Sequence, residues 1–369
     1  MRATVYLIGA GPGAPDLISL RGYRCLQKAD VVIFDHLVHP ELLEAAPQHA
    51  ERIDVGSAAP EPRDQDAICY LLAEKAREGK TVARLKWGDP FLFDQGGEEA
   101  LFLHEQGVRY EVIPGAPHAI GATAYAGIPI TYPGGGDTVT FVRGHEDEGR
   151  EKARIDWTAL AKLEGTIVSY AGPQQMPKMI GSLIDHGRPP DEPAAIILKG
   201  TLSSQRTVTG TLSSLLAQLK DEPLGAGLLI VGKVVNFRDH LRWFDSRPLF
   251  GRRALVMHSK EQPDDLAELL RANGADVVID SDADLDIYRL LLDRKIDVVT
   301  FTSASAVLTF AANVGVDQAS DLLGHTLVAV QGSAAADAAA RANINPAVQE
   351  PAGSITAFAD AIVTRFQGN

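Results

Sequence analysis

Residues 3–13 read Ala-Thr-Val-Tyr-Leu-Ile-Gly-Ala-Gly-Pro-Gly, an apolar run that ends in a loop with three glycines. A second glycine-centred loop, Lys86-Trp87-Gly88-Asp89-Pro90, also follows an apolar run. Each pattern predicts a strand followed by a loop with backbone amides open to a polar small molecule, because glycine places no Cβ in the way. The two stretches therefore predict an α/β fold whose ligand site is built on loops.

The first loop alone leaves two interpretations open. Gly9–Ala14 fits the dinucleotide-binding pattern G-x-G-x-x-G/A, and Asp35 ends the next apolar run, where a ribose-binding acid would stand. Pro12 and Pro15, however, stiffen the turn and delay the helix that would carry a pyrophosphate. The alternative is a tight turn between a strand and a helix.

Composition limits the class of partner. The 369 residues are 45% apolar and carry a net charge of −13, without the basic runs that a nucleic-acid surface needs. Two cysteines in no metal-ligand spacing predict neither a disulfide framework nor a metal site, and we expect a reducing cytoplasm. We expect no signal peptide, because the first residues enter a strand directly. Three prolines in the uncharged stretch 116–136 argue against a membrane span.

Short apolar runs alternate with helical patterns along the whole chain, which predicts parallel α/β sheets. The glycine-rich stretch 133–136 marks the expected hinge between the first two domains, and a Ser-Arg-Pro linker precedes a third. The expected domains are 1–133, 134–245 and 251–369. The expected strands cover 5–8, 31–34, 81–85 and 110–113, then 138–142, 165–170, 194–198 and 227–231, and in the third domain 253–257, 276–279, part of 297–307 and 327–332.

An ordered set of motifs covers about the first two thirds of the chain. It comprises Gly9–Gly13, Phe34–Val38, Arg84–Phe91, Gly96–Glu99, Pro114-Gly115, Ala124–Thr131, Gly144-His145, Pro193–Ala195, Gln205–Leu212 and Ile230–Val235. Together these motifs resemble the uroporphyrinogen-III C-methyltransferases of the tetrapyrrole methylase family. The resemblance implies two α/β domains with a cleft between them, and a homodimer.

The resemblance also implies a reaction and its residues. S-adenosyl-L-methionine (SAM) would methylate uroporphyrinogen III to precorrin-2, for sirohaem or cobalamin, and leave S-adenosyl-L-homocysteine. Asp35 would be the base that removes a ring proton, with Thr131 beside the acceptor. The implied SAM-binding residues are Gly9, Gly11, Pro12, Gly13, Gly88, Asp89, Leu92, Pro117, His118, Ala171, Ala195 and Gly200.

Several positions depart from the family pattern on the acceptor side. The lysine that serves the family as proton donor is replaced by Ser57, an arginine by Gln95, and a His-Arg pair by Tyr132-Pro133. Asp94 adds an acid, and Ala171 replaces a methionine. Because uroporphyrinogen carries many carboxylates, the remaining candidates to bind it are Arg143, Lys86 and Tyr132, with Arg21, Arg24 and Arg206 as further cations.

These departures keep two further hypotheses open. One retains the fold and SAM but changes the acceptor to a less anionic molecule. The other is a catalytically silent SAM-binding protein.

The third domain contains Phe301–Val307, which resembles uroporphyrinogen-III synthase. That family has two lobes with the second inserted into the first, whereas only residues 280–295 fill the corresponding space here. We therefore expect a single flavodoxin-like lobe without synthase activity. Ser303 and Ser305 can bind a carboxylate, but serines at such positions more often order loops.

Overall fold

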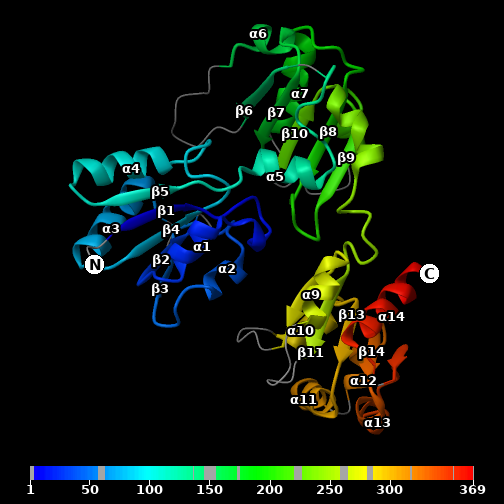
Figure 1. The fold of residues 1–369 in the computed structure, drawn as a ribbon. Helices are drawn as coiled ribbons and strands as arrows, with labels where there is room; N and C mark the ends of the chain where they lie inside the picture. Colours follow the sequence, from blue (N-terminus) through cyan, green and yellow to red (C-terminus); the bar gives the residue numbers. More distant parts are fainter. Residues whose placement is uncertain are drawn as a thin grey trace. The chain divides into compact units, whose positions relative to one another are not determined.

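The computed structural model describes residues 4–56, 63–135, 137–144, 155–172, 175–219, 227–257, 265–280, 286–315, 318–351 and 353–368. Contacts within the chain divide it into two compact units, Met1–Arg242 and Trp243–Asn369 (Figure 1). The predicted boundary at residues 133–136 thus falls inside the first unit. None of the helices described is both long and apolar enough to cross a membrane.

The first unit begins with a five-stranded parallel sheet in the order β3-β2-β4-β1-β5. Its strands are β1 Val5–Gly9, β2 Val31–Phe34, β3 Glu51–Asp54, β4 Val82–Lys86 and β5 Tyr110–Ile113. Apolar side chains from α3 (Gln65–Arg77) and α4 (Gly96–Glu105) cover one face. Side chains from α1 (Leu20–Leu26) and α2 (Pro40–Glu44) cover the other, and a short 3-10 turn, η1 (Pro15–Leu17), precedes α1. All four expected strands are present, within one residue at each end.

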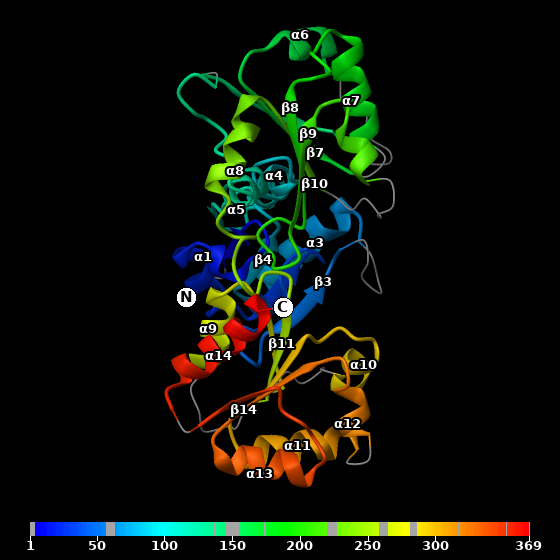
Figure 2. The same ribbon diagram turned by 90° about the vertical axis from the view of Figure 1, so that its right-hand side faces the viewer.

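The second sheet of this unit has the order β6-β7-β10-β8-β9. Its strands are β6 Val139–Arg143, β7 Thr166–Ala171, β8 Pro193–Leu198, β9 Arg206–Thr211 and β10 Gly227–Val231. Its helices are α5 His118–Tyr125, α6 Trp157–Lys162, α7 Gln175–Asp185 and α8 Arg238–Leu241, with 3-10 turns η2 Leu215–Leu219 and η3 Lys233–Phe237. Figure 2 shows α7 on one side of the sheet and α5 and α8 on the other.

The prediction that this second sheet is parallel was wrong. Only β6 and β7 run parallel, whereas β10 is antiparallel to β7 and β8, and β8 is antiparallel to β9. Residues 199–205 between β8 and β9 are too few for the crossover that a parallel pair needs, so β9 folds back directly. Strand β9 is not among the expected strands, because its apolar pattern is weak; in the structure Val208 is its only buried residue.

The second unit is one five-stranded parallel sheet in the order β12-β11-β13-β14-β15. Its strands are β11 Arg253–Met257, β12 Asp276–Ile279, β13 Val298–Phe301, β14 Leu327–Gln331 and β15 Val348–Glu350. One face packs on α10 (Ile287–Leu292), α11 (Ala304–Val314), α12 (Ala319–Leu322) and α13 (Ser333–Arg341); the other packs on α9 (Asp265–Ala272) and α14 (Ile355–Gln367). This strand order confirms the predicted flavodoxin-like fold.

Candidate active site

The two glycine loops of the first unit are hydrogen-bonded to each other. Gly11 N donates to Gly88 O at 3.3 Å, and Gly88 N donates to Gly11 O at 2.8 Å. The loop after β5 joins them, since a Cβ on Gly115 would lie 2.3 Å from Gly88 O and 2.7 Å from Gly9 Cα. Glycine is therefore required here for close packing of three strand ends, and these two amides are not open to a ligand.

The far end of the first loop packs against α5 and the loop after β8. Pro12 O accepts a hydrogen bond from His118 Nδ1 at 2.9 Å. Gly13 has φ +148°, and a Cβ there would lie 2.8 Å from Thr201 Oγ1, which itself accepts from Ala14 N at 2.9 Å. The loop that fits the dinucleotide-binding pattern thus connects the first sheet to the second, through α5 and the loop after β8.

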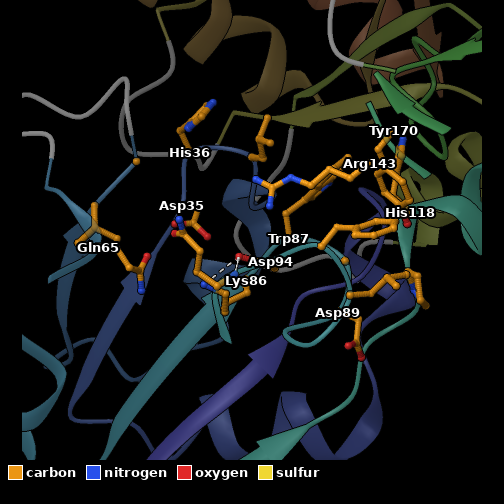
Figure 3. A pocket seen from close by; sticks show the side chains of 18 of the residues that line it. Asp35, His36, Gln65, Lys86, Trp87, Asp89, Asp94, His118, Arg143 and Tyr170 are labelled. Atoms are coloured by element: carbon orange, nitrogen blue, oxygen red, sulfur yellow. Dashed lines mark hydrogen bonds and ion pairs between the residues drawn. The ribbon is translucent and has the colours of Figure 1, made fainter. Parts of the chain in front are cut away.

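A cavity of about 530 Å³ lies between the two sheets of this unit (Figure 3). This volume falls within the range of roughly 300–1,000 Å³ that small-molecule sites occupy. Side chains after β2 and along β4 line one part of it, and side chains from β6, β7 and α5 line another. Figure 3 shows Asp35, Lys86 and Asp94 together on one side, with Trp87, His118 and Tyr170 on the other.

The cavity brings together about half of the residues expected to form the site. Its lining includes Asp35, Lys86, Gly88, Asp89, Leu92, Pro117, His118, Arg143 and Ala171. It also includes residues to which the sequence analysis gave no role in binding or catalysis, among them His36, Arg63, Gln65 and Tyr170. Arg63 comes before α3, and no motif or spacing indicated that this part of the chain reaches the cavity.

Other expected residues do not line this cavity. Gly9, Gly11, Pro12 and Gly13 pack between loops, and Gly200 lies so close to α5 that a Cβ would sit 2.3 Å from Ala122 Cβ. Ala195 is fully buried in β8. Thr131 is exposed, and Tyr132 is 43% exposed with its ring 3.9 Å from that of Phe237. The departure Ser57 and the motif residue His145 lie outside the described residues.

Asp89 orders the loops around the cavity. Its Oδ1 accepts from Phe91 N at 2.8 Å, and its Oδ2 accepts from Gly115 N at 3.1 Å. Both carboxylate oxygens therefore hold backbone amides of two different loops. The carboxylate also lines the cavity, so a ligand there can contact it while both backbone bonds are kept.

Five charged side chains form what we term the charge cluster: Arg84, Lys86, Glu99, Asp35 and Asp94. Glu99 Oε1, fully buried, lies 3.2 Å from Arg84 Nε and 2.8 Å from Lys86 Nζ. Arg84 Nη2 lies 2.9 Å from Asp35 Oδ1, and Lys86 Nζ lies 3.0 Å from Asp94 Oδ1. The cluster thus connects a buried centre to two carboxylates on the cavity wall. Lys86, expected to bind substrate, is already paired with two acids.

Burial and charge shift the pKa values of the cluster in different directions. Burial alone would raise the pKa of Glu99, but Arg84 and Lys86 outweigh it and lower that pKa. Burial would lower the pKa of Arg84, yet Glu99 and Asp35 raise it. The pKa of Asp94 is raised by burial, which Lys86 and the Gln95 amide offset only in part. Glu99 is therefore firmly ionised, whereas Asp94 binds a proton more readily than an ordinary aspartate.

His118 is a neutral imidazole over a wide pH range. Burial lowers its pKa from 6.5 to about 4, although the hydrogen bond to Pro12 O acts in the opposite direction. Because Pro12 O is an acceptor, Nδ1 carries the proton and Nε2 is left as an acceptor. The Trp87 ring lies 4.2 Å from the His118 ring, tilted by 38°. This wall of the cavity is aromatic and uncharged.

Comparison with known families agrees with this architecture. A family model described as Tetrapyrrole (Corrin/Porphyrin) Methylases matches residues 4–216, which is more than half of the chain. The chain belongs to the tetrapyrrole methylase family. A second model, described as uroporphyrinogen-III synthase HemD, matches residues 244–359, within the second unit.

Relatives within the tetrapyrrole methylases are similar across the first unit. An S-adenosyl-L-methionine-dependent uroporphyrinogen III methyltransferase of Methanosarcina barkeri is 41% identical over 64% of this chain and 94% of its own length. A siroheme synthase of Chromobacterium violaceum is 46% identical over 65% of this chain and 51% of its own length. The chain thus spans about half the length of most of the curated relatives it matches.

Solved structures match the same region. The uroporphyrin-III C-methyl transferase of Thermus thermophilus, in complex with S-adenyl homocysteine, is 35% identical over 63% of this chain and 99% of its own, with a TM-score of 0.55. A cobalt precorrin-4 methyltransferase is 28% identical over 63% of this chain and 95% of its own, with a TM-score of 0.57. These matches confirm the predicted fold of the first unit.

Proposed function

We propose that the first unit transfers a methyl group from SAM to a ring carbon of uroporphyrinogen III, giving precorrin-2. The observation that carries this proposal is the cavity, which joins Asp35 to the Gly88-Asp89 loop and His118 in a family of methylases. Relatives that match the first unit over nearly their whole length, and whose names give this activity, support the same reaction. Transfer from a sulfonium needs chiefly a fixed geometry, which a rigid cavity between two sheets can supply.

The cavity residues fit a SAM molecule, which supplies an activated methyl group on a positively charged sulfur. We assign its site to the wall formed by Trp87, Pro117, His118 and Tyr170, together with Asp89. Aromatic faces attract a sulfonium, and a neutral His118 does not repel it. Gly88 contributes shape instead of a free amide, because its N–H and C=O are hydrogen-bonded to Gly11.

Asp35 is our candidate for the base that removes the ring proton after methylation. It stands directly after β2 at the cavity, and Arg84 holds its Oδ1 at 2.9 Å. Arg84 is in turn fixed by Glu99, so the carboxylate has a defined orientation. A positioned carboxylate of this kind typically contributes about 10²–10⁴-fold to a rate.

A substrate with many carboxylates needs cations on the acceptor side of the cavity. Arg63 and Arg143 line the cavity and are the cations we assign to substrate carboxylates. Arg84 and Lys86 are less suited to this role, because Asp35, Asp94 and Glu99 already pair with them. That pairing favours, as a second candidate, an acceptor with fewer carboxylates than uroporphyrinogen III.

We further propose that the second unit has no synthase activity of its own and that the protein forms a homodimer in the cytoplasm. The described part of the second unit is a single sheet, whereas a site between two lobes needs both to exclude water. Ser303 Oγ accepts from Ala306 N at 3.1 Å and so caps α11, which favours the structural role of this serine. Both cysteines are unpaired, which suits a reducing compartment.

The test is methyl transfer from isotope-labelled SAM by the purified protein, with uroporphyrinogen III and the less carboxylated coproporphyrinogen III offered in parallel. We expect label in uroporphyrinogen III and a mass increase of the product. Label in coproporphyrinogen III alone would favour the second candidate. Binding of SAM by calorimetry without transfer to either acceptor would contradict both.

A further inference from the structure

The charge cluster does not balance. It holds two cations, Arg84 and Lys86, against three carboxylates, so its net charge is −1. One hydrogen-bond acceptor of the cluster is also left without a donor, since the buried Glu99 Oε2 has no hydrogen-bond partner among the described residues. Uncompensated charge is costly away from water. Uptake of one proton would make the cluster neutral.

Geometry selects the carboxyl group that takes this proton. Glu99 Oε1 is held by both cations, and Asp35 Oδ1 is held by the guanidinium of Arg84. In the described part of the chain, Lys86 is the one cation that forms an ion pair with Asp94, and its ammonium also pairs with Glu99 at a shorter distance, 2.8 Å against 3.0 Å. Burial and the nearby Asp35 both raise the pKa of Asp94. Asp94 is thus the least compensated member of the cluster.

Asp94 can contact both a molecule in the cavity and the solvent. Its side chain lines the cavity, on the same side as Asp35 (Figure 3). The side chain is 24% exposed, whereas Glu99 is not exposed at all. A proton taken from a molecule in the cavity can therefore pass from Asp94 to solvent.

We propose, on the basis of the proposed function, that Asp94 is a second proton acceptor of the site alongside Asp35. When the methyl–sulfur bond breaks, its electron pair stays on sulfur and leaves a neutral thioether. The new carbon–methyl bond uses a π pair of the ring, which becomes cationic until a ring proton leaves. Asp94, like Asp35, is placed to accept that proton, and with the proton on either carboxylate the cluster passes from −1 to neutral.

In any pH measurement, the titration of Asp94 must be distinguished from that of the other titratable groups around the cavity. The charged and titratable residues that line the cavity with it are Arg84 and Lys86 from β4, Asp35 and His36 after β2, Arg63 before α3, Asp89 after β4, His118 from α5, Arg143 from β6 and Tyr170 from β7. Glu99 from α4 lies behind Lys86. His36 is an imidazole on the same wall, so His36→Gln is measured in parallel.

The first experiment needs no turnover. The full chain is labelled with ¹³C at the aspartate carboxyl groups, and its spectrum is titrated with acid. We expect one signal, absent from Asp94→Asn and retained in His36→Gln, that titrates above the ordinary aspartate value of 3.8. A signal of Asp94 at or below that value would overturn the proposal, whatever the acceptor of the enzyme is.

The second experiment follows methyl transfer against pH. Asp94→Asn should lower the maximal rate by about 100-fold and move the acidic limb of the profile to lower pH, with SAM binding retained by calorimetry. The control Glu98→Gln removes an exposed carboxylate from α4, the helix that begins two residues after Asp94, and should leave rate and profile unchanged. A wild-type profile in Asp94→Asn, or a limb that moves only in His36→Gln, would overturn the proposal. If the wild-type protein transfers no methyl group, the proposed function is refuted. The carboxyl titration alone then tests whether Asp94 takes up a proton above the ordinary aspartate value.

Discussion

Single glycines determine how closely the strand ends around the cavity approach. Gly9 ends β1, and Gly115 in the loop after β5 lies so close to it and to Gly88 O that neither Gly9 nor Gly115 has space for a Cβ. Gly88, in the loop after β4, needs glycine for its φ of +74°. Sequence alone suggested that the glycines of these loops leave amides free for a ligand. In the structure the Gly11 and Gly88 amides bond to each other's carbonyls, so glycine here serves packing.

Gly115→Ala should lower the free energy of unfolding by about 3 kcal/mol, because its Cβ would meet the Gly88 carbonyl at 2.3 Å and backbone cannot move aside cheaply. Gly97→Ala is the matched control, since nothing lies within 4 Å of its Cβ and alanine favours the helix. Denaturant unfolding of both variants checks this. Equal stability of the two would contradict the close packing.

His118 predicts a pH dependence of stability. Its pKa falls from 6.5 in the unfolded chain to about 4 in the folded protein, so below pH 6.5 the unfolded state binds more protons. Stability should therefore be unaffected above pH 6.5 and fall by about 3 kcal/mol as the pH drops to 4. His118→Gln should remove this loss. Unfolding curves measured between pH 4 and 7.5 that are parallel for both proteins would contradict the assignment.

At the scale of elements, apolar runs predicted strands well where both faces are buried. The runs 31–34 and 253–257 are strands with the predicted ends, because β2 and β11 are covered by helices on both sides. The same patterns could not give strand direction in the second sheet. The direction of β9 depends on the seven residues after Leu198, which are too few for the crossover that a parallel pair needs. Strand β9 itself is hard to recognise, because apolar and polar residues alternate only weakly in its sequence.

Helix α11 offers a test of the second unit's core. Phe310 is fully buried, with its ring 5.3 Å from that of Phe301, whereas Leu308 on the same helix is 60% exposed. Phe310→Ala should cost about 3–5 kcal/mol of the unit's stability, and Leu308→Ala less than about 0.5 kcal/mol. Unfolding followed by circular dichroism distinguishes them. Similar losses in both variants would mean that α11 packs differently.

At the scale of the molecule, motif order predicted the family, the two-sheet unit and a cavity containing Asp35, Gly88-Asp89 and His118. It could not predict that Gln65 and Arg84 join Glu99 and Asp35 in one network, because these residues lie up to 64 positions apart and share no spacing rule. Nor could it reveal that Thr131 and Tyr132 lie away from the cavity. Those contacts depend on how two sheets pack.

The division of the chain into Met1–Arg242 and Trp243–Asn369 predicts separate behaviour of the two units. A chain ending at Arg242 should bind SAM with the same affinity as the full protein within about two-fold, because all residues lining the cavity lie before that point. Calorimetry on both chains measures this. A loss of binding in a truncated chain that still unfolds cooperatively would contradict it.

The central claim is that the cavity of the first unit is a site of methyl transfer in which Asp35 acts. The most direct measurement compares wild-type protein with Asp35→Asn, each incubated with SAM and freshly prepared uroporphyrinogen III, with the product masses then determined. We predict methylated product from the wild type, and SAM binding with at least about 100-fold slower methylation from the variant. Unmethylated uroporphyrinogen III after incubation with the wild type, or equal rates for the two proteins, would contradict the claim.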